Sequence, residues 1–160
     1  MRCIFALLFC LLFPGFAAAQ ESLNNLPLPR WAALASPEAN LRTGPGKRYP
    51  IDWVLKKKNL PVEIIQEFEH WRRVKEPDGA DGWIHKSMLT GTRYVMMKKN
   101  VTLYAQPSDN TRVVASLQKG VIANMTQCQK TWCRLTIEQY DGWAPKKHLW
   151  GVYPTETLKD

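Results

Sequence analysis

The chain spells one short pattern twice. It reads DGWIHKSML at residues 81–89 and DGWAPKKHL at residues 141–149. Other features recur in the same order before each pattern: a basic-aromatic pair, a leucine four residues before a proline, and a tryptophan three residues before an aliphatic residue. An internal repeat constrains the fold more than any other sequence feature, because each copy must build the same unit. The chain therefore contains one unit that is copied once.

Each unit is predicted to be all-β. Short runs such as PVEII and GVIANM are rich in β-branched residues and are separated by Gly, Pro, Asn and Asp, which favour turns. No window keeps the apolar spacing of a long amphipathic helix. Asp-Gly predicts a turn, because glycine accepts a positive φ and aspartate binds its own backbone. A catalytic aspartate in each unit is the alternative, although aspartate in turns is more common.

The N-terminus has the pattern of a secretory signal peptide over residues 1–19. A basic residue, Arg2, precedes an apolar run from Cys3 to Phe13, and three alanines end the segment. The alternative is a retained membrane anchor, but the run is shorter than the roughly 20 residues that span a bilayer. We expect cleavage before Gln20, a linker at 20–29 and no transmembrane segment in the mature chain. The mature protein is then periplasmic or secreted.

Cleavage would leave two cysteines, Cys128 and Cys133, with four residues between them. Two cysteines of an exported protein are more often bonded than reduced, and this spacing suits a β-hairpin. Half of a metal site is the alternative, but no second cysteine pair exists and the three histidines have no ligand spacing. We predict a disulfide, with no metal and no cofactor.

The chain is basic, with 22 Lys and Arg against 14 Asp and Glu and a formal net charge of +8. Losing Arg2 with the signal peptide leaves 21 against 14, or +7. Export argues against nucleic acid as a partner and leaves lipid head groups, cell-wall carboxylates and acidic proteins. A solvated surface that keeps the protein soluble explains the charge equally well.

Three stretches resemble bacterial Src-homology-3-like (SH3-like) domains: ANLRTGPGKRY, a later W-x-x-V, and DGWIHKSML. The resemblance divides the mature chain into a first copy at 30–91, a degenerate second copy at 92–152 and a tail at 153–160. Val152 and Tyr153 have side chains that can pack, while the last residues look loose. The resemblance implies two tandem small SH3-like β-barrels in an envelope protein. Members commonly bind cell-wall peptides or other proteins, often beside a hydrolase.

No signature of catalysis accompanies the repeat. The sequence has no nucleophile elbow and no phosphate-binding glycine loop, and its two cysteines are expected to be bonded to each other. The interpretation is a non-enzymatic protein.

Aromatic and basic residues crowd one loop of the first copy and the strand after it. Aromatic rings give contact area in shallow peptide grooves, and arginine or lysine meets a carboxylate. The alternative for Arg42 is that it caps a turn or pairs with a local acid, and the tryptophans that recur in both copies are interpreted as structural. The predicted ligand-binding residues are Arg42, Lys47, Arg48, Tyr49 and Trp53.

These observations predict an exported, non-enzymatic binding or scaffolding module of the cell envelope. Its partner would be a cell-wall peptide or an envelope protein. The alternative is an accessory regulator or inhibitor of a cell-wall enzyme. The first copy is expected to bind, because the second lacks the Gly-Pro pair and carries Asp109 in the equivalent stretch. Only three residues, 90–92, join the copies, so we expect them to pack together.

Overall fold

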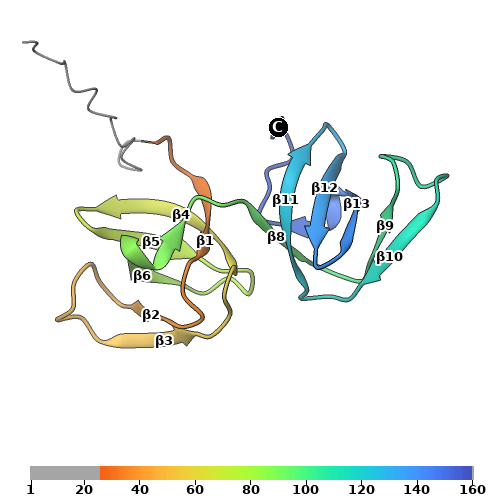
Figure 1. The fold of residues 1–160 in the computed structure, drawn as a ribbon. Helices are drawn as coiled ribbons and strands as arrows, with labels where there is room; N and C mark the ends of the chain where they lie inside the picture. Colours follow the sequence, from red (N-terminus) through yellow and green to blue (C-terminus); the bar gives the residue numbers. More distant parts are fainter. Residues whose placement is uncertain (1–25, 160) are drawn as a thin grey trace, which may run out of the picture.

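The computed structural model describes residues 26–159, which form two all-β units side by side (Figure 1). The predicted signal peptide at 1–19 and most of the linker at 20–29 lie outside the described residues. No helix in the described part is long and apolar enough to cross a membrane. The only helical segments there are two short 3-10 turns, η1 (Lys86–Met88) and η2 (Lys146–His148).

Each unit is one seven-stranded antiparallel sheet. The strands of the first copy are β1 (Arg30–Leu34), β2 (Ala39–Arg42), β3 (Ile51–Leu55), β4 (Pro61–Phe68), β5 (Trp71–Lys75), β6 (Asp81–His85) and β7 (Leu89–Thr90). Those of the second copy are β8 (Tyr94–Met97), β9 (Val101–Tyr104), β10 (Val113–Leu117), β11 (Ile122–Cys128), β12 (Trp132–Ile137), β13 (Tyr140–Pro145) and β14 (Leu149–Trp150).

The two sheets have the same topology. Their strand orders are β3-β2-β6-β5-β4-β1-β7 and β10-β9-β13-β12-β11-β8-β14, which match element by element. The register also shifts at matching places, between Ile64 and Gln66 and between Met125 and Gln127. Such bulges bend a strand, which lets a sheet curl around a core. The prediction of an all-β tandem repeat is confirmed, although among the described strands no pairing joins β3 to β7 and closes a barrel.

Alternation along the strands gives each copy its own core. In β4 the inward residues Val62 and Ile64 are buried, and in β11 Ala123 and Met125 occupy the same places. Side chains of successive strand residues point to opposite faces, so a run with this spacing buries one face. Met96 and Ile122 of the second copy pack against the core of the first. The two cores are therefore neighbours and not isolated units.

The repeated Asp-Gly-Trp forms the first residues of β6 and follows Tyr140, the first residue of β13, but its glycine is not the turn residue that the sequence predicted. Neither Gly82 nor Gly142 is among the glycines with a positive φ in the described chain, whereas Gly79 in the preceding turn has φ +93°. A Cβ on Gly82 would lie 2.6 Å from Leu41 Cγ, and one on Gly142 would lie 3.0 Å from the carbonyl oxygen of Tyr104. Glycine is needed here because another strand crosses closely.

The repeated aspartate has a structural partner in each copy. Asp81 accepts hydrogen bonds from Arg73 at 3.0 Å, and Asp141 accepts one from Arg134 at 2.7 Å. Each arginine lies on the strand paired with the aspartate's own strand. The repeated tripeptide thus lies at the start of a strand in a tightly crossed sheet.

The two copies are in contact, as the short connection predicts. Trp150 Nε1 donates to the carbonyl oxygen of Pro61 at 3.0 Å, and its ring lies 4.9 Å from that of Trp31 in an edge-on arrangement. Lys57 Nζ donates to the carbonyl oxygen of Gly120 at 2.6 Å. The short connection leads us to expect Val95, Met96, Met97 and Trp150 at this interface, and of these Trp150 and Met96 reach it. Val95 and Met97 are fully buried in the second core instead.

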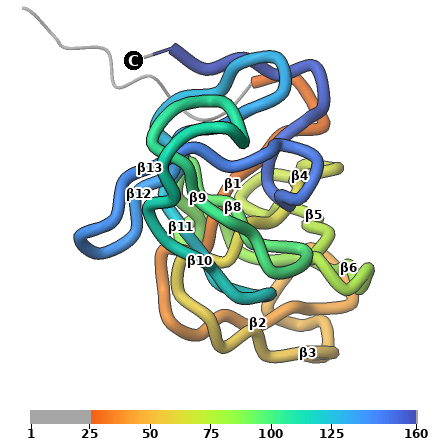
Figure 2. The backbone as a smooth tube through the Cα atoms, turned by 90° about the vertical axis from the view of Figure 1, so that its right-hand side faces the viewer, coloured from red at the N-terminus to blue at the C-terminus, as the bar shows by residue number. Residues whose placement is uncertain are grey.

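The C-terminal residues are held in place, which differs from the expectation that they are loose. Figure 2 shows the blue C-terminal segment passing close to the orange start of the first copy, where the ring of Tyr153 lies 5.3 Å from that of Trp31. Glu156 pairs with Arg93 at 2.5 Å, and Leu158 exchanges two backbone hydrogen bonds with Cys128. Paired backbone groups and a partly buried ion pair fix a segment that composition alone cannot place.

Candidate binding grooves

Each copy has a surface groove at the same place in its fold. The groove of the first copy, here called the first groove, has a volume of about 310 Å³ and is lined by Glu38, Ala39, Asn40, Arg42, Lys47, Trp71, His85 and Met88. The groove of the second copy, here called the second groove, has a volume of about 720 Å³. Its lining residues are Lys98, Tyr104, Asp109, Lys130, Thr131, Trp132, Pro145, Lys146, Lys147, His148, Leu149, Val152 and Pro154.

Strand pairing shows that the two grooves are equivalent. In the first copy, Trp71 lies opposite His85 across β5 and β6. In the second copy, Trp132 lies opposite Pro145 across β12 and β13. The last residue of each 3-10 turn, Met88 or His148, completes the wall. One structural position has therefore been kept as a groove while its side chains have changed.

A half-buried tryptophan lines each groove. Trp71 meets the ring of His85 edge-on, with centroids 5.5 Å apart. Trp132 meets the ring of Tyr104 edge-on at 5.8 Å. Each tryptophan is the first residue of its strand, directly after the tip of a hairpin. The hairpin thus carries a ring whose remaining exposed area is available to a ligand, and aromatic rings give large contact area at low entropic cost.

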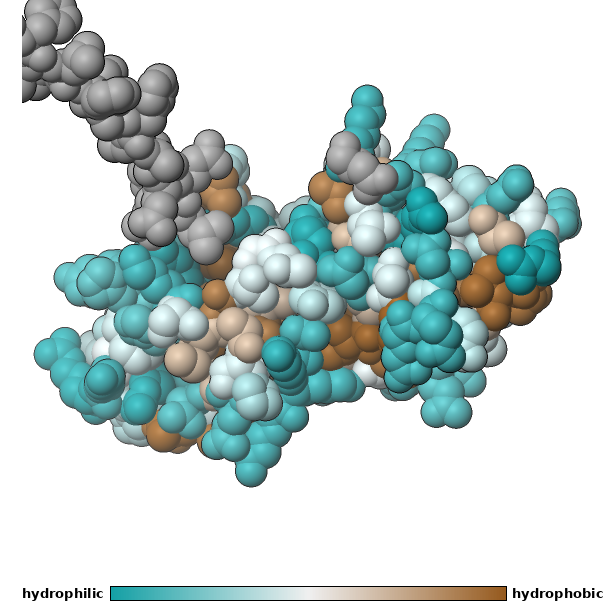
Figure 3. All heavy atoms as spheres, viewed as in Figure 1, coloured by the Kyte–Doolittle hydropathy of each residue, from teal (hydrophilic) through white to brown (hydrophobic). Residues whose placement is uncertain are grey.

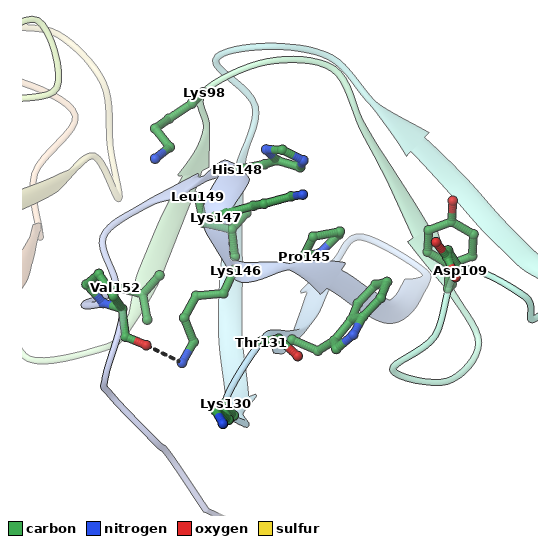
Figure 4. Close-up of a pocket in the computed structure, with 13 residues that line it drawn as sticks. Lys98, Asp109, Lys130, Thr131, Pro145, Lys146, Lys147, His148, Leu149 and Val152 are labelled. Carbon is green, nitrogen blue, oxygen red and sulfur yellow. Dashed lines mark hydrogen bonds between the residues drawn. The ribbon is translucent and has the colours of Figure 1, made fainter.

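The two grooves differ in charge. The first groove has one carboxylate, on Glu38, and two cations, on Arg42 and Lys47. The second groove has a single carboxylate, Asp109, and four lysines, Lys98, Lys130, Lys146 and Lys147, which Figure 4 shows around the groove.

One of those four lysines is committed to the fold. Lys146 is buried, and its Nζ donates to the carbonyl oxygens of Pro154 and Glu156 at 3.2 and 2.6 Å. Burial lowers the pKa of this amine. The three other lysines leave the second groove net positive, which suits an anionic ligand.

A histidine adjoins each groove. Burial, together with the charges of Lys99, Lys147 and Lys98, lowers the pKa of His148. Burial, followed by electrostatic interactions with His70, Lys47, Lys86 and Arg72, also lowers the pKa of His85. Both imidazoles are therefore neutral near pH 7, and each can accept a hydrogen bond through one nitrogen and donate through the other.

The structure places Arg42 and Lys47 of the predicted site together in the first groove. Arg42 Nη1 donates to the carbonyl oxygens of Lys47 and Tyr49, at 3.2 and 2.7 Å. This is the turn-capping role that the sequence left open, since the guanidinium holds the ends of the loop. Arg42 thus shapes the groove wall in addition to lining it.

Arg48 and Tyr49 are next to the first groove but are not among its lining residues. The guanidinium carbon of Arg48 lies 5.2 Å from the centre of the Tyr49 ring. That ring packs on Gly44, where a Cβ would come within 2.4 Å of it. The glycine of the Arg-x-Gly-Pro motif is required because the tyrosine ring covers it.

Trp53 lies apart from both grooves. It is on β3, the edge strand of the first sheet, and 58% of its surface is exposed. It is not among the residues that line the first groove. The sequence also missed the groove tryptophans, Trp71 and Trp132, because their recurrence was interpreted as purely structural. A recurring tryptophan at a hairpin tip, where burial is partial, could have indicated a shared surface.

A third groove, of about 950 Å³, lies at the junction of the copies, and its lining includes Trp31 and Tyr153. Its arginines are already paired with carboxylates, Arg30 with Glu67 and Arg93 with Glu156. These ion pairs neutralise much of its charge, so the junction groove is less suited to an anion than the second groove. Among the residues that the structure describes, no cluster of His, Cys, Asp and Glu could hold a metal ion.

The chain is similar to part of a protein that is named as an amidase, and it aligns with two solved structures. It is 21% identical over 162 residues to YrvJ of Bacillus subtilis (strain 168), which is named as an N-acetylmuramoyl-L-alanine amidase. The match covers 91% of this chain, and the chain spans only 30% of that relative's length. Among solved structures, NlpC2 of Trichomonas vaginalis aligns with a TM-score of 0.36 and 15% identity, over 79% of this chain and 49% of its own. NlpC1 of the same organism gives 0.35 and 16%, over 76% and 45%.

A family model describes both copies. The model, described as "Bacterial SH3 domain", matches residues 35–91 and again residues 97–151. The two matches fall on the two seven-stranded sheets, each of which includes one of the grooves. The chain belongs to the bacterial SH3 domain family and carries two tandem copies of that domain.

Proposed function

We propose that this protein is a non-enzymatic binding module of the bacterial cell envelope that recognises a cell-wall peptide through its two grooves. The observation that carries the proposal is the pair of equivalent grooves, each lined by the first tryptophan of a hairpin strand. A groove that persists while its side chains change is a shared feature of the fold. Two such grooves on a pair of domains in contact with each other suit a long, repetitive ligand.

The second groove has the chemistry for the charged part of such a ligand. Its volume of about 720 Å³ lies in the range of ligand sites. Trp132 and Tyr104 offer ring area for aliphatic side chains and amide planes. Lys98, Lys130 and Lys147 can meet a carboxylate, and charge-assisted hydrogen bonds are about twice as strong as neutral ones.

The first groove suits a smaller and less charged segment. Arg42 and Lys47 are the two predicted ligand residues that line it, opposite the carboxylate of Glu38. We assign them to a polar, amide-rich part of the peptide. In this proposal both copies bind the peptide, whereas the sequence led us to expect binding by the first copy.

Family and relative support a location in the envelope. The chain belongs to the bacterial SH3 domain family, and nearly its whole length aligns with part of a protein named as a cell-wall amidase. That alignment covers 30% of the relative. The amidase activity of the relative is not assigned to this chain. The proposal concerns recognition.

Sedimentation with purified peptidoglycan tests the proposal. Lys98→Glu with Lys147→Glu reverses two exposed charges of the second groove and should lower retention by about tenfold, equivalent to roughly 1.4 kcal/mol. Lys75→Glu with Lys159→Glu makes the same change in net charge at two exposed sites that line neither groove, and it should leave retention nearly unchanged. Equal losses in both variants would show that binding is merely a response to net charge.

The same assay separates the alternative function. If the unmodified protein stays in solution beside peptidoglycan but captures one envelope protein in a stoichiometric complex, the protein is an accessory regulator of that partner. Retention on peptidoglycan alone supports direct recognition of the wall.

A further inference from the structure

The edge strand of the first copy carries an exposed apolar ridge. Ile51, Trp53 and Val54 on β3 are 47%, 58% and 40% exposed, although side chains of this kind are usually covered. β3 pairs only with β2 and is the terminal strand of its sheet. Figure 3 shows apolar residues at the lower edge of the first copy, where β3 lies in Figure 1, with hydrophilic residues around them.

Basic residues lie at both ends of this ridge. Lys47 and Arg48 are exposed in the loop before β3, and the run Lys56–Lys58 is exposed directly after it. Asp52 is the only acidic residue between Lys47 and Lys58. We call the segment 47–58 the β3 edge. It combines an apolar centre with cationic ends, and it lies outside both grooves except for Lys47.

The second copy has no equivalent surface. Its edge strand, β10, exposes Val113 to a similar degree, at 57%, but its other residues are Val114, Ala115, Ser116 and the buried Leu117. Ala115 pairs with Leu103 as Trp53 pairs with Leu41, so alanine stands where the first copy has tryptophan. The ridge is therefore a property of the first copy and not a requirement of the fold.

Two features argue against the addition of another strand to β3. Its pairing with β2 has a register shift between Leu41 and Arg42, and such a bulge twists an edge away from further pairing. Pro50, which has no N–H to donate, immediately precedes the strand, and lysines follow it. Proline and lysine at an edge are common devices against strand pairing. What the β3 edge presents to a partner is its side chains more than its backbone.

We propose that the β3 edge docks on the surface of an anionic lipid bilayer. Tryptophan is favoured at the boundary between head groups and acyl chains, where one part of the ring is apolar and its N–H is wet. Ile51 and Val54 add exposed apolar area along the same edge strand. The flanking lysines and arginine are attracted to anionic head groups, an effect that falls off within a Debye length. Docking there leaves the second groove free for the wall.

Co-sedimentation with phosphatidylglycerol vesicles at low ionic strength tests this inference. Trp53→Ser should lower partitioning by about tenfold, since it removes the largest apolar contact. Lys56→Gln with Lys58→Gln should lower it by about 25-fold, because each cation near the surface contributes roughly a factor of five. Lys57 is left unchanged since it contacts Gly120 of the second copy. Melting temperatures should stay nearly unchanged, because all three positions are exposed.

Three controls make the test decisive. Lys75→Gln with Lys159→Gln removes the same charge elsewhere, and Val113→Ser alters the matching edge of the second copy; both should bind like the unmodified protein. Phosphatidylcholine vesicles should retain little protein. The inference is overturned if the unmodified protein does not sediment with phosphatidylglycerol, if the lysine control loses as much binding, or if Trp53→Ser has no effect. Binding of a protein through the β3 edge without lipid binding would also overturn it.

Discussion

The hairpin tips of the two copies are held by different chemistry at the same position. In the first copy, Glu67 of β4 faces Arg72 of β5, with Arg72 Nε 2.7 Å from Glu67 Oε1. In the second copy, Cys128 of β11 faces Cys133 of β12, and the predicted disulfide joins them. An ion pair between a buried arginine and a partly exposed glutamate in one copy thus takes the place of a covalent bond in the other.

Each link includes the residue that directly follows a groove tryptophan in the sequence. Trp71 precedes Arg72, and Trp132 precedes Cys133. Each link is supported by further hydrogen bonds. Arg72 is 3% exposed and also donates to the carbonyl oxygens of Glu69 and Trp71, whereas Cys128 is joined to the tail by backbone hydrogen bonds. In each copy a link across the hairpin holds the tip next to the groove tryptophan, by an ion pair in the first copy and by a disulfide in the second.

The largest expected effect comes from breaking the ion pair. Arg72→Ala removes a buried cation and leaves Glu67 with Arg30 as its remaining arginine partner. Removing one member of a buried pair typically costs about 3–5 kcal/mol, and we expect about 3 kcal/mol because Arg30 compensates in part. Urea unfolding measures it. Arg73→Ala, next along the strand, breaks an exposed pair with Asp81 and should cost less than about 1 kcal/mol. Equal costs would mean that Arg72 does not hold the tip.

A smaller effect is expected from removing the disulfide. Cys128→Ser with Cys133→Ser opens a loop with only four residues between the sulfurs, and closing so short a loop stabilises by about 2 kcal/mol in the chain-entropy model. The loss should appear in urea unfolding. Mass spectrometry of the exported protein after alkylation supplies the control, and two alkylatable thiols would show that the link is absent from the native protein.

The smallest effect concerns pH. An unfolded histidine titrates near pH 6.5, and the folded protein lowers the pKa of His148. As pH falls below 6.5, the unfolded chain therefore takes up its proton first, and the free energy of unfolding decreases. His148→Gln should lose less stability between pH 7 and pH 5 than the unmodified protein does. Urea unfolding at the two pH values measures both losses. Equal losses of unfolding free energy in the variant and in the unmodified protein would contradict the lowered pKa of His148.

The fold was predictable because the sequence repeats its spacing. The spacing of Trp71 and Val74 recurs in Trp132 and Leu135, and it predicts an equivalent strand in each copy. The motif around Gly44 and Pro45 adds a family resemblance. The role of Gly82 was not predictable in the same way. Asp-Gly has a strong local preference for turns, but the close crossing of Leu41 over Gly82 is a contact between residues far apart in the chain.

The grooves were only partly predictable for a related reason. Arg42 and Lys47 are neighbours in sequence, so one loop reveals both. The first groove also needs Trp71 and His85, which lie 29 and 43 residues after Arg42 in the sequence. Strands β5 and β6 bring them to that loop. Local composition placed Trp53 with the loop because it follows closely, yet the exposed edge strand carries it to another surface.

The indole N–H resonances of the seven tryptophans test the central claim most directly, since each reports on one location. In a two-dimensional NMR titration with a soluble cell-wall stem peptide, the resonances of Trp132 and Trp71 should shift in a saturable manner, with Trp132 responding first. That of Trp53 should stay still, and assignment by single Trp→Phe variants identifies each peak. If the peptide leaves both groove tryptophans unmoved, or shifts Trp53 alone, the grooves are not the peptide-binding sites.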